Sequence, residues 1–153
     1  MSDRTELGLH HFQALCGEAL LSKKRIFERA AEVMGIALEL QSEPIYRALL
    51  AREKLGSTAI GEGVAIPHCR INHLSEAAGC LVSLKEPIDY GSTDGSEVDI
   101  IFVLLVPEQA TQDHLNLLAG LARVFSESET RAKVRSANSA GQLTDLFTTG
   151  AAP

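Results

Sequence analysis

The feature that most constrains this chain is an apolar run at residues 100–106, preceded by Val98 and closed by Pro107. The run is rich in Val, Ile and Leu and shows no alternation of apolar with polar residues, which is typical of a strand buried on both faces. It is far shorter than the roughly 20 residues that are needed to span a bilayer. The sequence therefore predicts a central strand in a sheet that helices cover on both sides.

Helical spacing of apolar side chains follows two capping positions in the first third of the chain. Ser22 can accept a hydrogen bond from an amide of the first turn, and Gly35 is expected either to end that helix or to weaken it. A second helix is expected from Ser42, with Pro44 in its first turn, where a missing N–H costs little. Gly56 is its expected left-handed stop.

The C-terminal third predicts three more helices. Thr111 precedes the first of them and is its expected N-cap. The pairs Ser126 with Glu129 and Ser139 with Gln142 have the spacing of a capping box, in which two side chains satisfy two free amides at a helix start. Each pair predicts the beginning of a further helix.

Shorter apolar segments at residues 64–66 and 79–84 predict strands, the first ending at Pro67. Residues 87–96 hold Pro, Gly and Asp and predict connecting turns. Residues 1–21 are expected to form an irregular or short-helical lead-in, and residues 150–153 a loose tail. Strands alternating with helices predict an α/β fold with a small, mainly buried sheet, in one domain over residues 1–153.

Composition excludes several classes of protein. The 153 residues include 20 Asp+Glu against 14 Lys+Arg, and this net charge of -6 argues against nucleic-acid binding through a basic surface. Apolar residues make up 45% of the chain, enough to offset the entropy of ordering. No signal peptide or membrane insertion is expected, because no sufficiently long apolar run is present. Three irregularly spaced cysteines predict reduced thiols in the cytoplasm and no structural zinc site. No cofactor is expected.

Two of the five histidines occupy positions where ligands gather in α/β sheets. His68 follows a short strand and the rigid Pro67, after a loop that contains Gly61 and Gly63. His114 lies in the first turn of the helix that Thr111 precedes, where backbone amides attract anions. We expect a neutral imidazole at residue 68 to act as a nucleophile.

A phosphorylated histidine needs hydrogen-bond donors nearby. Arg52 is a candidate, since a guanidinium forms charge-assisted hydrogen bonds with phosphate oxygens. The hydroxyls of Ser57 and Thr58 are further candidates for phosphate binding. No role is assigned to the histidines at residues 10 and 11, and His73 is expected to be a solvated side chain.

The stretch from residue 52 to residue 68 resembles the active-site segment of enzyme IIA domains of the phosphotransferase system. The resemblance is to the mannitol/fructose class and most of all to its nitrogen-regulatory branch, and it extends roughly over residues 22–147. It is carried by an acidic residue, an Ile-Gly pair and the motif Val64-Ala65-Ile66-Pro67-His68, with Leu104-Leu105-Val106-Pro107 and Gln112-Asp113-His114-Leu115 further on. Cys69 stands where the family frequently has glycine; the thiol is either sensitive to oxidation or, as we expect, a small packing residue.

The resemblance implies a small mixed sheet flanked by helices, and a site in which His68 accepts a phosphoryl group on Nε2. Arg52 would stabilise the phosphate, and His114 would be the second active-site histidine. The implied donor is a phosphorylated HPr-like carrier, and the implied targets are regulatory partners such as kinases or transporters. The protein would thus act mainly as a phosphocarrier and regulator, with a phosphohistidine intermediate.

Three other functions remain open at this point. A member of the sugar-transporting branch would pass phosphate to a IIB partner. Four soft and borderline ligands could instead form a metal site, although their spacing fits no zinc pattern; they are His68, Cys69, His73 and His114. In a purely structural interaction domain, the histidines would be inert.

Overall fold

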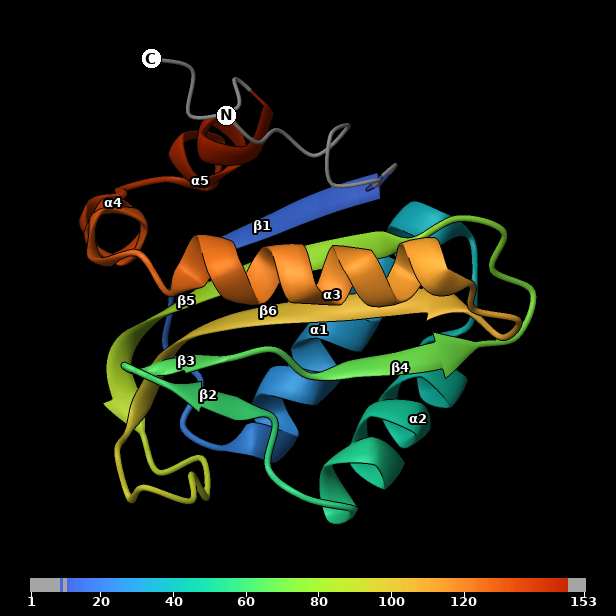
Figure 1. The fold of residues 1–153 in the computed structure, drawn as a ribbon, viewed down its shortest axis with the longest axis horizontal. Helices are drawn as coiled ribbons and strands as arrows, with labels where there is room; N and C mark the ends of the chain where they lie inside the picture. The colour runs from blue at the N-terminus through green and yellow to red at the C-terminus, as the bar shows by residue number, and fades with distance from the viewer. Residues whose placement is uncertain (1–8, 10, 149–153) are drawn as a thin grey trace.

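The computed structural model describes residue 9 and residues 11–148, and these form a six-stranded mixed sheet between two layers of helices (Figure 1). The expected α/β class, with a small mixed sheet flanked by helices, is confirmed. No helix within these residues is long and apolar enough to cross a membrane. In chain order the elements are β1 (His11–Glu18), α1 (Lys23–Leu38), α2 (Ser42–Lys54), β2 (Ala59–Gly61), β3 (Val64–Ala65), β4 (His68–Ile71), β5 (Ala78–Ile88), β6 (Val98–Pro107), α3 (Gln112–Phe125), α4 (Ser128–Ser136) and α5 (Ala140–Thr148).

Strand β6 lies at the centre of the sheet, as its apolar run predicts. It pairs antiparallel with β5 on one side and parallel with β3 and β4 on the other. Strand β1 pairs parallel with β5, and β2 pairs antiparallel with β3. The consecutive residues Ile100 and Ile101 are both fully buried but belong to different hydrophobic clusters. Both faces of β6 are therefore covered, which explains why its sequence does not alternate.

The sheet separates two hydrophobic cores. Helices α1 and α2 cover one face and contribute Ile26 and Leu49 to the first core. Helices α3, α4 and α5 contribute Leu121, Val134 and Leu143 to the second core on the opposite face. Figure 1 shows α3 in front of the sheet and α1 with α2 behind it.

A two-residue interruption separates β3 from β4. Both strands lie along the same side of β6, with Ile66 and Pro67 between them. The Pro67 carbonyl still accepts a hydrogen bond from the Leu104 amide at 2.9 Å, although proline itself has no N–H to donate. The strand predicted to end at Pro67 therefore resumes at once, and His68 begins β4 opposite Leu104.

The first two helices begin where the sequence predicts, but the first ends later. The Ser22 hydroxyl accepts from the Arg25 amide at 3.2 Å, which confirms the predicted cap. Of the two alternatives for Gly35, the one in which it ends the helix is wrong, because α1 continues to Leu38. A Cβ at Gly35 would lie 2.9 Å from the Leu40 carbonyl oxygen, so this glycine permits the close turn towards α2.

The C-terminal helices confirm one of the two predicted helix starts, with Ser139 as the cap of α5. The Ser139 hydroxyl accepts from the Gln142 amide at 3.2 Å, and Gln142 Oε1 accepts in turn from the residue before Ser139. The other prediction is wrong: Ser126 lies at the C-terminal end of α3 and donates its hydroxyl to the Arg123 carbonyl. Helix α4 begins after Glu127, which makes no side-chain capping bond.

The N-terminal segment corrects a further prediction, since residues 11–18 form β1 and not an irregular or helical lead-in. Phe12 stacks on Phe147 with ring centroids 5.2 Å apart, so burial against α5 and pairing with β5 outweigh a weak local strand pattern. Strand β5 also extends into the predicted turn region and ends at Ile88. Residues 1–8 and 10, and the predicted loose tail at residues 150–153, lie outside the described part of the chain.

Candidate functional site

The imidazole of His68 is oriented by the backbone just before it. Its Nδ1 lies 2.9 Å from the Ile66 carbonyl oxygen. A carbonyl oxygen can only accept, so Nδ1 carries the ring proton and donates it to this bond. The lone pair of the neutral ring is then on Nε2, which is the atom available as a nucleophile.

The imidazole of His114 is oriented the opposite way. The Thr111 amide donates to His114 Nδ1 at 2.9 Å across the first turn of α3. An amide N–H can only donate, so Nδ1 holds the lone pair and the proton of the neutral ring lies on Nε2. His114 therefore offers a hydrogen-bond donor, whereas His68 offers an acceptor.

These two histidines line the same pocket, whose volume is about 510 Å³. The pocket is lined by β4 and by the carboxyl-terminal half of the parallel strand β6, together with the second half of α2 and the first half of α3. The carboxyl ends of strands are where ligands bind in α/β sheets. Leu55 and Leu115 also line the pocket, and 84% and 57% of their respective surfaces are exposed.

Arg52 brings a fixed positive charge to this pocket from the last turn of α2. Its Nη1 donates to the Gly56 carbonyl at 3.0 Å, which uses one of the five N–H donors of the guanidinium. The structure thus brings together the three residues that the sequence marks as the centre of the site: His68, His114 and Arg52.

A second arginine, Arg70, lines the pocket and was missed from the sequence. It lies on β4 two residues after His68, and its side chain is exposed. Alternate residues of a strand point to the same side of the sheet, so this spacing was the available indication.

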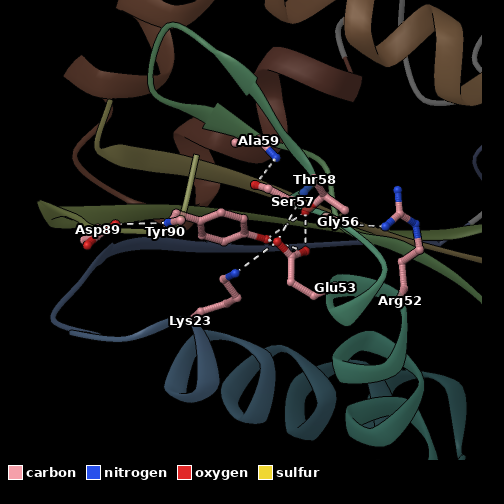
Figure 2. A network of polar contacts seen from close by, with 10 residues as sticks. Lys23, Arg52, Glu53, Gly56, Ser57, Thr58, Ala59, Asp89 and Tyr90 are labelled. Carbon is pink, nitrogen blue, oxygen red and sulfur yellow. Dashed lines mark hydrogen bonds and ion pairs between the residues drawn. The ribbon is translucent and has the colours of Figure 1, made fainter. Parts of the chain in front are cut away.

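The two hydroxyls predicted to bind phosphate do not line the pocket. The Ser57 hydroxyl accepts from the Ala59 amide at 3.2 Å. The Thr58 hydroxyl donates to Glu53 Oε1 at 2.7 Å and lies 2.9 Å from the Tyr90 hydroxyl, inside a buried network (Figure 2). Thr58 therefore belongs to this buried network and not to the residues that line the pocket.

Neither of the other two histidines in the described part of the chain, His11 and His73, lines this pocket. His73 is exposed in the turn after β4, as expected for a solvated side chain. Its backbone has a positive φ of 68°. His11 lies 4.0 Å from Glu76, and the histidine at residue 10 is outside the described residues. Within residue 9 and residues 11–148, no three His, Cys, Asp or Glu side chains are grouped so that they could hold a metal ion.

Comparison with solved structures finds the same fold. The crystal structure of nitrogen regulatory protein IIA-Ntr from Neisseria meningitidis superposes with a TM-score of 0.83 at 38% identity, over 89% of this chain and 93% of that one. IIA mannitol from Escherichia coli superposes with a TM-score of 0.73 over 89% and 96% of the two chains. At 16% identity the latter similarity shows the fold alone.

Comparison of sequences finds nitrogen regulatory proteins and, at 34% identity over 88% of this chain and 21% of the relative, the PTS system 2-O-alpha-mannosyl-D-glycerate-specific EIIABC component of Escherichia coli K12. The nitrogen regulatory protein of Pseudomonas aeruginosa is 43% identical over 123 residues, which cover 80% of each chain. That of Escherichia coli K12 is 37% identical over 128 residues, or 83% of this chain and 78% of the relative. Residues 13–149 match the family model described as "Phosphoenolpyruvate-dependent sugar phosphotransferase system, EIIA 2". The chain therefore belongs to the EIIA 2 family of the phosphotransferase system.

Proposed function

We propose that this chain is the phosphocarrier of a nitrogen-related phosphotransferase relay. It accepts a phosphoryl group on His68 from an HPr-like carrier and regulates partner proteins through its phosphorylation state. One observation carries the proposal: a histidine with its lone pair on Nε2 shares a pocket with a histidine that donates from Nε2 and with Arg52. The names of the Neisseria, Pseudomonas and Escherichia relatives support the nitrogen-regulatory branch.

The chemical step needs one acceptor and no cofactor. The Nε2 lone pair of His68 attacks the phosphorus atom of the phosphorylated carrier, and a new N–P bond forms. The bond between phosphorus and the carrier breaks, and its electron pair returns to the carrier. The proton on Nδ1 of His68 stays on the ring, where the Ile66 carbonyl holds it.

Three donors in the pocket stabilise the phosphoryl oxygens during this transfer. Arg52 and Arg70 supply positive charge, and His114 supplies its Nε2–H. Charge-assisted hydrogen bonds of this kind act where charge develops in the transition state. Because the chain as a whole is acidic, the positive charge that balances the phosphoryl group must come from these local cations.

Phosphorylation would change which proteins can dock at this pocket. Leu55 and Leu115 present apolar surface beside the cations, so the unmodified site fits a partner surface that is partly apolar. A phosphoryl group brings negative charge to that surface and alters its fit to such a partner. Kinases and transporters are the classes of target that we propose.

A cytoplasmic location is part of the proposal. The three cysteines Cys16, Cys69 and Cys80 are all free, which suits a compartment that keeps thiols reduced. The phosphoryl donor must reach the same compartment.

Onward transfer to a IIB partner is the second candidate. IIA mannitol of Escherichia coli has been solved in complex with phosphorylated enzyme IIB, and it shares the fold at a TM-score of 0.72. The two candidates differ after the first step: a transport component loses its phosphoryl group to a IIB protein, whereas a regulator retains it until the relay reverses.

The test follows labelled phosphoenolpyruvate through a reconstituted relay. We expect stoichiometric labelling of the wild-type protein, no labelling of His68→Ala, and slower labelling of Arg52→Ala. His73→Ala is the matched control, because it removes an exposed histidine outside the pocket and should be labelled like the wild type. If His68→Ala were labelled as well as the wild type, the assignment would be wrong; rapid loss of label to an added IIB protein would favour the transport component.

A further inference from the structure

A buried carboxylate, Glu53, lies next to Arg52 in sequence and joins four segments of the chain (Figure 2). Only 5% of its side chain is exposed. Lys23 Nζ at the start of α1 lies 3.1 Å from Oε2, and the Thr58 amide donates to the same oxygen at 3.1 Å. The Thr58 hydroxyl donates to Oε1 at 2.7 Å, and the Tyr90 hydroxyl donates to it at 3.4 Å.

This carboxylate is thus fully paired, which is what keeps a buried charge tolerable. Lys23 also lies over the Tyr90 ring, 4.6 Å from its centroid. Burial raises the pKa of the Tyr90 hydroxyl, so the phenol keeps its proton and remains a donor. The three partner residues, Lys23, Thr58 and Tyr90, are far apart in sequence, and Glu53 holds them at one point.

The network holds the short turn that closes the end of α2. Thr58 is bound to Glu53 through its amide and its hydroxyl, which fixes one end of the turn. At the other end, the Gly56 carbonyl accepts from Arg52. Figure 2 shows the side chains of Arg52 and Glu53 leaving the end of the helix in different directions, one towards the turn and one into the network.

We propose that Glu53 is a positioning residue for phosphoryl transfer and acts through Arg52. By anchoring Thr58, it places the Gly56 carbonyl where it can hold one N–H of the Arg52 guanidinium. The plane of the guanidinium is then set before the phosphoryl group arrives, and its other donors are left for the pocket. Preorganisation of this kind lowers the cost of reaching the transition state. The inference rests on the proposed function.

The decisive test is a double-mutant cycle on the rate of phosphoryl transfer to His68, measured in single turnovers with saturating phosphorylated carrier. Glu53→Gln keeps the size of the side chain and removes its charge, and we expect a rate about tenfold lower. In an Arg52→Ala background the same change should alter the rate less than about twofold, because the group that Glu53 positions is gone.

Thr58 provides a second route to the same test should Glu53→Gln fail to fold. Thr58→Val removes the hydroxyl that donates to Glu53 while keeping the shape of the side chain. It should lower the rate of transfer in the protein that retains Arg52 but not in Arg52→Ala. Thr58→Ser restores the hydroxyl and should restore most of the rate. Leu143→Ala is the stability control: it opens a cavity in the core on the other face of the sheet and should leave the rate unchanged.

The outcomes separate this inference from the function on which it rests. If the wild type accepts no phosphoryl group on His68, the proposed function fails and the inference with it. If the wild type is phosphorylated but Glu53→Gln and Thr58→Val cost the same factor with and without Arg52, the positioning role alone is overturned. A loss of rate in Leu143→Ala as large as that in Glu53→Gln would also overturn it.

Discussion

Cys69 follows His68 directly, yet its environment suits packing better than reaction. Cys69 is among the residues that line the pocket, and it packs against the core on the α1 and α2 side of the sheet. Burial raises its pKa from the ordinary 9.0 to about 12, and that of Cys80 likewise. A thiol is nucleophilic and readily oxidised only as the thiolate, so neither side chain is reactive near neutral pH. The structure thus favours the packing role that the sequence suggests for Cys69.

Alkylation measures this protection. At pH 9.0 the thiol of Cys69 is half ionised in an unfolded chain but protonated in the folded protein, because its folded pKa is raised. We expect iodoacetamide to modify Cys69 at least about tenfold more slowly in the native protein than in urea, as read by mass spectrometry. Equal rates of modification in both states would contradict this protection.

The raised pKa of Cys69 also affects stability. The folded protein keeps the thiol proton that the unfolded chain loses, so the free energy of unfolding falls as pH rises from 9.0 towards 12.

At the scale of single residues, the sequence marks the centre of the site but not its surroundings. Three residues could be found because each is a polar group at a predicted end of an element: His68 after a strand, Arg52 at the end of a helix and His114 at the start of a helix. Thr58 is polar and close in sequence to Arg52, but its hydroxyl is bound to Glu53 in the interior. Which way a loop side chain points depends on tertiary partners such as Tyr90, 32 residues further along the chain, and no local pattern records them.

At the scale of elements, helix α4 holds the β2–β3 hairpin through two arginines. Arg135 makes a bidentate ion pair with Asp99 at 2.9–3.2 Å and donates to the Glu62 carbonyl at 2.7 Å. Arg131 lies 3.4 Å from Glu62 Oε1. Gly63 follows in the same turn with a φ of 81°, and a Cβ there would lie 2.5 Å from Arg135 Nη2. The hairpin leads directly into the segment that carries His68.

Breaking this contact should loosen the hairpin without unfolding the protein. We expect Arg135→Met to lower the free energy of unfolding by about 1–2 kcal/mol, since the pair is partly solvent-screened but bidentate. Amide hydrogen exchange should accelerate at residues 59–65. The control is Arg47→Met, which removes an exposed ion pair with Glu43 on α2 and should change stability by less than about 0.5 kcal/mol. Equal effects of the two variants would contradict a role for the α4 contact.

Local patterns predict some elements well and others poorly, for identifiable reasons. Strand β6 and the start of α1 are predicted because burial on both faces and the Ser22 cap each leave a mark in the sequence. Strand β1 is missed because its segment, with a glycine and no β-branched residue, is held by its neighbours in the sheet and by α5. The end of α1 is misplaced because Gly35 serves the packing of the next turn and not the termination of the helix.

At the scale of the whole molecule, the sheet divides the interior into two cores that meet only through its strands. Ile26 of α1 is fully buried in one core, and Ile100 of β6 is fully buried in the other. Four of the five phenylalanines belong to the second core, where the rings of Phe102, Phe125 and Phe147 lie 5.7–6.0 Å apart. The pocket lies at one end of the sheet, so it depends on both layers remaining packed.

This division predicts additive effects of small core changes. Ile26→Val and Ile100→Val should each lower the free energy of unfolding by about 0.5–1.5 kcal/mol, because each removes one buried methylene. The double variant should show the sum within about 0.5 kcal/mol, since the two side chains share no core. Urea unfolding followed by circular dichroism measures all three values. A large deviation from the sum would mean that the two layers are coupled through the sheet.

The orientations of the two imidazoles have a consequence for how such a site can change over time. Each imidazole is hydrogen-bonded to a main-chain atom, the carbonyl of residue 66 or the amide of residue 111, and the Thr111 hydroxyl lies 3.3 Å from the same nitrogen of His114. Exchanging the side chains at these positions leaves both bonds in place, and only a proline at residue 111 would delete one of them. The main-chain bonds that place the protons in this pocket therefore persist when the side chains at residues 66 and 111 are substituted, so alanine scanning of these two positions would not remove them.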